Sequence, residues 1–213
     1  MHALIVGTTQ SGKSTLAKLL CKTIKNKGGN CAVLSPTTET GWDADFKTSD
    51  GGLFLKFAKE NTKHFLFVDE SGDAIGRYNE EMNWLATGSR HLGHSVIFNV
   101  QASSQISTAI RSCCQDAYIF ATSRGVLKLL AEDFNEPAIM KHEKMPQYHF
   151  LVCSRFQAMK MGRLDNGGAS CYIGQLSEFS SIKQGESDDP TNDDKRDDPT
   201  SSGSGVVGDS DSV

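Results

Sequence analysis

The sequence of 213 residues has few of the features that mark zinc-binding, membrane-spanning or secreted proteins. Its six cysteines are scattered and form no C-x-x-C pair, which argues against a zinc site. No apolar run approaches the roughly 18–20 residues of a membrane-spanning helix, so we expect no transmembrane segment. We expect no signal peptide, because the first apolar run, at residues 3–6, is typical of a strand. We therefore expect a reducing environment in which the cysteines are free thiols, mostly buried.

Aromatic residues are missing from residues 184–213. That stretch has nine acidic and two basic residues, so it carries a charge of −7, and residues 1–183 carry +3 of the total of −4. Low hydrophobicity combined with a high net charge predicts a segment that cannot bury enough surface to fold. We expect a globular domain over 1–183 and a disordered acidic tail over 184–213.

Strand and helix patterns alternate along the globular part. Short apolar runs typical of buried parallel strands lie at 3–6, 31–34, 64–68, 95–100 and 116–121. Helical patterns lie between or after them, at about 16–24, 53–59, 79–91, 104–112 and 126–130. Residues 36–50 are polar and turn-rich, and a last strand at 148–153 is expected to pair antiparallel with residues around 169–173. The alternation predicts an α/β fold with a mostly parallel central sheet and helices on both faces.

Residues 7–14 read G-T-T-Q-S-G-K-S and stand between the first strand and the first helix. This is a complete phosphate-binding loop, whose amide groups surround a phosphate at the positive end of the following helix. Lys13 is expected to contact the β- and γ-phosphates, and Ser14 to bind Mg²⁺ through its hydroxyl. The residues expected to bind ATP are Gly7, Thr8, Thr9, Gln10, Ser11, Gly12, Lys13, Ser14 and Thr15.

Polar residues follow two later apolar runs, where the corresponding strands should end. The first of these runs leads to Asp69 and Glu70, and the second leads to Gln101. Ligands bind at the carboxyl ends of strands in open α/β sheets, so Asp69 is expected to hold the Mg²⁺ shell and Glu70 to polarise the attacking water. Gln101 is a candidate to hydrogen-bond the γ-phosphate or that water. The alternative interpretation is that these are ordinary cap and turn residues.

Three arginines are candidates to complete the active site: Arg90, Arg111 and Arg124. A γ-phosphate transition state needs more positive charge than the phosphate-loop lysine supplies, and a neighbouring subunit often provides it. We rank Arg90 first, although each arginine is also explained as an ordinary cation at a helix end. His91 and His94 form an H-x-x-H pair without a third ligand, and we interpret them as surface histidines.

Taken in order, these motifs resemble the FtsK–HerA superfamily of DNA-pumping ATPases. The resemblance rests on G-T-T-Q-S-G-K-S, then L-F-V-D-E-S, then a helix that runs into S-R-H-L-G-H-S-V-I-F-N-V-Q, and it covers roughly residues 1–155. Within the superfamily, the chain is most similar to the genome-packaging ATPases of membrane-containing icosahedral viruses, because nothing is appended to the motor core. The resemblance implies a RecA-like P-loop NTPase fold.

The resemblance also implies a function: an ATP-driven translocase that packages double-stranded viral DNA into a preformed capsid. It implies a hexameric ring with ATP between subunits and DNA in the central channel. Capsid or portal proteins are implied as partners, and the host cytoplasm or the packaging vertex of the virion as the location. In such a ring, exposed lysines contact DNA phosphates without reading the base sequence. Our candidates for this role are Lys47, Lys56, Lys59 and Lys63.

Two other functions share parts of these motifs. A nucleoside kinase also has a phosphate loop and can show F-V-D-E, but it usually has a mobile lid with paired arginines, which the sequence does not show convincingly. A membrane-anchored secretion or phage-export ATPase is the other hypothesis, and the missing transmembrane segment counts against it. Duplex DNA should stimulate the ATPase of a motor, whereas a kinase should phosphorylate a nucleoside and ignore DNA.

Overall fold

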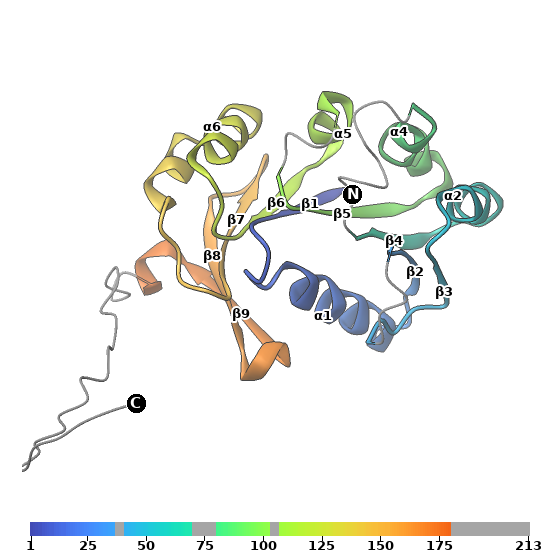
Figure 1. Ribbon diagram of the computed structural model, residues 1–213, viewed down its shortest axis with the longest axis horizontal. Helices are drawn as coiled ribbons and strands as arrows, with labels where there is room; N and C mark the ends of the chain where they lie inside the picture. Colours follow the sequence, from blue (N-terminus) through green and yellow to red (C-terminus); the bar gives the residue numbers. More distant parts are fainter. Residues whose placement is uncertain (37–40, 70–79, 103–106, 180–213) are drawn as a thin grey trace, which may run out of the picture.

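The chain is described here by a computed structural model, which covers residues 1–36, 41–69, 80–102 and 107–179. Figure 1 shows one twisted sheet with helices packed on both faces. The α-helices of the described residues are α1 (Lys13–Asn26), α2 (Gly51–Glu60), α4 (Glu80–Thr87), α5 (Thr108–Cys113) and α6 (Arg124–Asp133). Helix α1 covers one face, and the other four cover the opposite face. The predicted α/β fold is confirmed, while the expected tail at 184–213 lies outside the described residues.

The sheet of the described residues has nine strands in the order β3-β2-β4-β5-β1-β6-β7-β8-β9. They are β1 (Ala3–Val6), β2 (Asn30–Leu34), β3 (Phe46–Thr48), β4 (His64–Val68), β5 (Ser95–Val100), β6 (Asp116–Ile119), β7 (His149–Ser154), β8 (Lys160–Asp165) and β9 (Ser170–Gln175). In that order the first six strands, which begin with β3 and end with β6, pair in parallel. The remaining strands, β7, β8 and β9, pair antiparallel. The carboxyl ends of β1, β4, β5 and β6 therefore meet at one edge of the sheet.

Short 3-10 helices complete the described part of the chain: η1 (Ser89–Leu92), η3 (Pro137–His142), η4 (Asn166–Gly168) and η5 (Leu176–Phe179). Two strands were not expected from the sequence. Strand β3 lies in the stretch interpreted as turn-rich; it has three residues at the sheet edge, too few to show a periodic pattern. Strand β8 separates β7 from β9, which were expected to pair directly.

Both faces of the central strands are buried, which explains their continuous apolar runs. In β1, Leu4 and Val6 pack in the core beneath α2, α4, α5 and α6. Ala3 and Ile5 point the other way, into the core beneath α1. Strand β1 is thus fixed from both sides, and so is the start of the loop that follows it.

The cysteines of the described residues are free thiols, and four of them are buried: Cys21, Cys31, Cys114 and Cys153. Burial raises the pKa of the Cys114 and Cys153 thiols to about 12, so both stay protonated and unreactive at neutral pH. Their role is to pack the core. In the described part of the chain, no helix is long and apolar enough to cross a membrane.

His94 corrects one sequence-based expectation, because it is buried rather than on the surface. Its Nδ1 accepts a hydrogen bond from the backbone N–H of His64 at 3.0 Å, and its Nε2 lies 2.9 Å from the carbonyl oxygen of Ala58. Both ring nitrogens are therefore used to join α2 to the start of β4. His91 is exposed, as expected.

Candidate active site

The phosphate loop leaves β1 after Val6 and enters α1 at Lys13. A Cβ at Gly7 would lie 2.6 Å from Phe120 Cβ, so only glycine fits there. Gly12 has φ +111°, in the left-handed region that favours glycine. It is also the N-cap residue of α1, and no side chain of the described residues caps the helix. The positive amino end of this 14-residue helix is therefore left for an anion.

Lys13 brings a second source of positive charge into the loop. Its side chain is only 8 % exposed, and Nζ donates a hydrogen bond to the carbonyl oxygen of Thr8 at 2.8 Å. The ammonium group thus lies inside the loop, where bound phosphates would meet it. A cavity of about 290 Å³ opens above it, lined by Gln10, Gly12, Lys13, Ser14, Thr15, Gln147 and Tyr148.

A buried polar network joins the start of α1 to the two strands beside the loop. The Asn99 side-chain nitrogen donates to Asp69 Oδ1 at 2.5 Å and to Ser14 Oγ at 3.3 Å. Ser35 Oγ lies 3.5 Å from Asp69 Oδ2, a long hydrogen bond. Asp69 and Asn99 are 4 % and 3 % exposed. Such deeply buried polar groups are stabilised by having partners of this kind.

The sheet register explains why these residues meet. Leu34 is level with Val68, and Val68 is level with Phe98, so the next residues, Ser35, Asp69 and Asn99, are neighbours across three strands. Asn99 is also level with Ile5, which faces the core beneath α1. Its side chain therefore points toward the beginning of that helix.

Ser14 and Asp69 offer a hydroxyl and a carboxylate, the oxygen donors that Mg²⁺ prefers. Both bond to the same nitrogen of Asn99, which keeps the two oxygens close to each other beside the phosphate loop. The residues present therefore fit the expected magnesium ion. Sequence reasoning missed Asn99, although one amide inside the apolar run V-I-F-N-V was a usable signal, because a buried polar group needs partners.

Two residues, Gln101 and Glu70, are candidates for the hydrolytic step, and the described residues include only Gln101. Gln101 follows β5 directly and is exposed. It lies one residue beyond the level pair Val6–Val100, as Gly7 does, so it stands at the same sheet edge as the phosphate loop. Glu70, the expected base, lies outside the described residues.

The candidate arginines lie at three different places. Arg90 is exposed in η1, ahead of β5, and so lies at the amino ends of the strands, the edge opposite the phosphate loop. Arg111 is 7 % exposed, and its Nε lies 2.8 Å from Oδ2 of Asp133 in an ion pair. Arg124 begins α6, after β6, at the same edge as the loop, with a side chain 74 % exposed.

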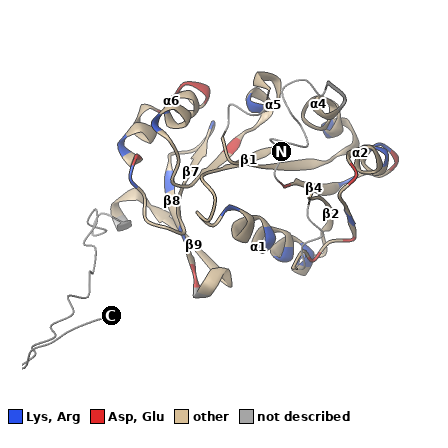
Figure 2. Cartoon of the chain, in the orientation of Figure 1, with Lys and Arg blue, Asp and Glu red and all other residues tan. Residues whose placement is uncertain are grey.

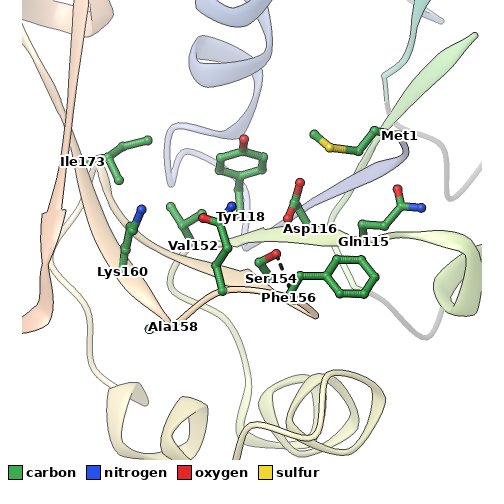
Figure 3. Close-up of a pocket in the computed structure, with 11 residues that line it drawn as sticks. Met1, Gln115, Asp116, Tyr118, Val152, Ser154, Phe156, Ala158, Lys160 and Ile173 are labelled. Atoms are coloured by element: carbon green, nitrogen blue, oxygen red, sulfur yellow. Dashed lines mark hydrogen bonds between the residues drawn. The ribbon is translucent and has the colours of Figure 1, made fainter.

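A larger cavity, of about 580 Å³, lies away from the loop, where β6 and β8 begin and β7 ends. Figure 3 shows Tyr118, Lys160 and Ile173 around it, with Met1 and Phe156 also at its margin. Its lining mixes apolar, basic and acidic side chains and contains none of the residues predicted to bind ATP.

Searches against protein-family models and curated proteins found no match. Solved structures do match. The genome-packaging NTPase B204 from Sulfolobus turreted icosahedral virus 2, in complex with AMPPCP, is 18% identical with a TM-score of 0.62 over 75% of this chain and 95% of that chain. B204 from Sulfolobus turreted icosahedral virus, described as a DNA-packaging ATPase, is 17% identical with a TM-score of 0.63 over the same shares, 75% and 95%.

The cytoplasmic domain of the type VII secretion ATPase EccC from Thermomonospora curvata is 14% identical, with a TM-score of 0.54 over 75% of this chain and 23% of that chain. At such identities the likeness shows the fold. The chain has the P-loop NTPase fold of these ATPases, as the resemblance to the FtsK–HerA superfamily implied.

Proposed function

We propose that this chain is an ATP-driven motor that moves double-stranded DNA and packages a viral genome into a preformed capsid. The observation that carries the proposal is the assembled nucleotide site, in which the phosphate loop, Ser14 and Asp69 are held together by Asn99. The DNA part of the proposal is supported by B204, which shares the fold of this chain and is described as a DNA-packaging ATPase. Capsid or portal proteins are the proposed partners, in the host cytoplasm or at the packaging vertex.

Each side chain of the site has a proposed role in hydrolysis. The loop amides and Lys13 bind the β- and γ-phosphates, while Ser14 and Asp69 hold Mg²⁺. A magnesium ion held by Ser14 and Asp69 would help to neutralise the charge that develops on the phosphates during hydrolysis. Gln101, at the same sheet edge, would hydrogen-bond the γ-phosphate or the attacking water. Glu70, the residue after Asp69, orients and polarises that water.

The position of Arg90 supports a role in a neighbouring subunit. Strand β5 has six residues, so it separates Arg90 from the phosphate edge by about 20 Å at roughly 3.3 Å per residue. Arg90 therefore cannot serve its own subunit, but its exposed side chain can reach the next subunit of a head-to-tail ring. Arg124 is the second candidate. We leave Arg111 out, because its guanidinium is buried and paired with Asp133 at 2.8 Å, whereas Arg124 stays 74 % exposed beside Glu143, at 3.9 Å.

The candidate DNA-contacting lysines lie together on one side of the fold. All of them are exposed, on β3, on α2 and just before β4: Lys47, Lys56, Lys59 and Lys63. Lys47 lies on β3, the strand at one end of the sheet, while Lys63 lies just before β4, two strands further in. Figure 2 shows further basic residues along α1 and around α6. We propose that the lysines on β3 and α2 face the DNA, with contacts that weaken as salt rises.

The test is the ATPase rate of the purified protein with and without duplex DNA. We expect duplex DNA to raise the rate, and Lys13→Ala to abolish tight ATP binding and activity, because it removes the charge that faces the phosphates. Glu70→Gln should still bind ATP but hydrolyse it very slowly. A wild-type rate that ignores DNA, together with phosphorylation of a nucleoside, would contradict the motor and support a kinase.

A further inference from the structure

An aromatic side chain lies directly against the phosphate loop. Tyr148 and Gln147 precede β7 and line the same cavity of about 290 Å³ as Lys13 and Ser14. The Tyr148 ring is so close that a Cβ on Gly12 would lie 2.9 Å from its Cδ1. Tyr148 is 40 % exposed, so it is open to solvent rather than packed in the core.

The backbone around Tyr148 is held in place against the loop. Its φ of 63° lies in the left-handed region, which a bulky residue rarely adopts, and residues in such conformations cluster at functional sites. The Tyr148 N–H donates to the carbonyl oxygen of Ser11 at 3.2 Å, and the Tyr148 carbonyl accepts from the Leu164 N–H at 2.9 Å. Gln147 Nε2 donates to the carbonyl oxygen of Gln10 at 2.9 Å. Residues 147–148 are therefore tied to the phosphate loop at two points.

Different residues stand on the two sides of the phosphate loop, and they indicate the direction in which a bound nucleotide would lie. Strands β5 and β4 lie on one side of β1, and they bring Asn99 and Asp69 to Ser14. Strands β6 and β7 lie on the other side, and Tyr148 stands there. Ser14 and Asp69 would hold a magnesium ion beside the terminal phosphates, so the γ end of the nucleotide would lie on the Asp69 side of the loop. The nucleoside end must then leave the loop on the opposite side, toward Tyr148.

We propose that Tyr148 forms the nucleobase subsite of this protein, by stacking its ring on the base of a bound nucleoside triphosphate. The inference rests on the proposed ATPase function and adds a residue that binds the base. Every base offers a π-face, so stacking supplies affinity while tolerating different bases. The cavity is small and open, so one face of the base stays toward solvent, where a neighbouring subunit or water meets it.

The test compares two ligands that share the phosphates and differ in the base: ATP and inorganic tripolyphosphate, each with Mg²⁺. Their affinities are measured by calorimetry for the wild type, Tyr148→Ala, Tyr148→Phe and Lys13→Ala. Tyr148→Ala should weaken ATP binding roughly tenfold to a hundredfold, the range expected for one stacked base, and leave tripolyphosphate binding unchanged. Tyr148→Phe should bind both ligands as the wild type does, because it keeps the ring.

Two results would overturn the inference: wild-type affinity for ATP in Tyr148→Ala, or an equal loss of affinity for ATP and tripolyphosphate. An equal loss would mean that Tyr148 only supports the shape of the loop. Tyr148→Leu repeats the comparison with a side chain that fills space without a π-face, and it too should lose affinity for ATP alone. Failure of the proposed function looks different, because then the wild type binds neither ligand, or Lys13→Ala binds both normally.

Discussion

Asn99 donates a hydrogen bond from its side-chain amide to the carboxylate of Asp69, with 2.5 Å between Nδ2 and Oδ1. The same nitrogen lies 3.3 Å from the hydroxyl of Ser14. One neutral side chain thus connects β4, β5 and the first turn of α1 at the point where magnesium is expected. Because Asp69 is almost fully buried, its charge depends on donors of this kind.

Replacing Asn99 should change stability in a way that depends on the substituent. Asn99→Ala removes a donor to a buried carboxylate and should cost about 1–3 kcal/mol of unfolding free energy. Asn99→Asp sets a second carboxylate against Asp69, and like charges raise the pKa of such a pair above its unfolded value. The folded protein then binds more protons than the unfolded chain, so Asn99→Asp should lose further stability as the pH rises from 5 to 8.

Urea denaturation of the wild type and both variants at several pH values measures this. The deficit of both variants should grow as the pH rises, and it should grow more steeply for Asn99→Asp, which adds a second charge, than for Asn99→Ala, which only removes a donor from Asp69. Equal stability of Asn99→Asp and wild type at pH 8 would mean that Asn99 does not donate to Asp69.

Replacing Arg111 should lower the free energy of unfolding, whereas replacing Arg90 should leave it nearly unchanged. The Arg111 and Asp133 side chains are 8 % and 19 % exposed, and Arg111→Ala leaves the Asp133 carboxylate without its ion-pair partner. Because Asp133 is only partly buried, the loss of its charged hydrogen-bond partner should cost about 1–3 kcal/mol. Arg90→Ala is the matched control, since an exposed substitution usually stays within about 0.5 kcal/mol. Chemical denaturation of both variants measures the difference. If Arg111→Ala is as stable as the wild type, Arg111 becomes again a candidate to complete the active site.

His2 should make the fold sensitive to mild acid. Burial, assisted by the charges of the N-terminus, Arg90 and His94, lowers the pKa of His2 to about 4. Its Nδ1 accepts a hydrogen bond from the Val96 N–H at 3.0 Å, which requires the neutral ring. The unfolded chain takes up the proton near pH 6.5, so stability falls between pH 6.5 and 4, by on the order of 3 kcal/mol.

Thermal melting across that pH range, compared between the wild type and His2→Asn, tests this prediction. Asparagine keeps an acceptor for Val96 but does not titrate, so the variant should lose less stability on acidification. Parallel melting curves for the two proteins at every pH would rule out His2 as the cause.

The phosphate loop of the candidate site could be predicted from the sequence, because its residues are consecutive. The phosphate loop follows an apolar run and precedes a helical pattern, so its placement at Gly7 to Ser14 needed no tertiary information. Asp69 and Gln101 were recognisable because each ends an apolar run, and ends of parallel strands meet at one edge. The same local reasoning predicted every strand from β1 to β7 except β3.

Other features of the site could not be predicted from the sequence, because they depend on contacts between residues far apart in the chain. Asn99 sits in the middle of a buried strand, and its role appears only when β4 and β5 are aligned so that Asp69 stands beside it. The sequence left Arg111 open as an active-site arginine or a helix-end cation, because its ion-pair partner Asp133 lies on another helix. Tyr148 reaches the phosphate loop from a segment more than a hundred residues away in the chain.

The central claim is that hydrolysis is completed between subunits, with Arg90 as the first-choice arginine. In related phosphoryl-transfer systems an arginine supplied by a second protein accelerates the reaction by on the order of 10³–10⁵. Arg90→Ala should therefore bind ATP normally and hydrolyse it poorly. Arg124→Ala is the second variant to make, because that residue stands at the phosphate edge.

The most direct test mixes Arg90→Ala with Lys13→Ala and measures the ATPase rate of the mixture. Each protein alone should be nearly inactive. In mixed assemblies, some interfaces pair an intact Lys13 with an intact Arg90, so the account predicts that activity returns and is greatest at intermediate mixing ratios. If no mixture of Lys13→Ala with an arginine variant regains activity while the subunits still assemble, hydrolysis is not completed between subunits, and the account is contradicted.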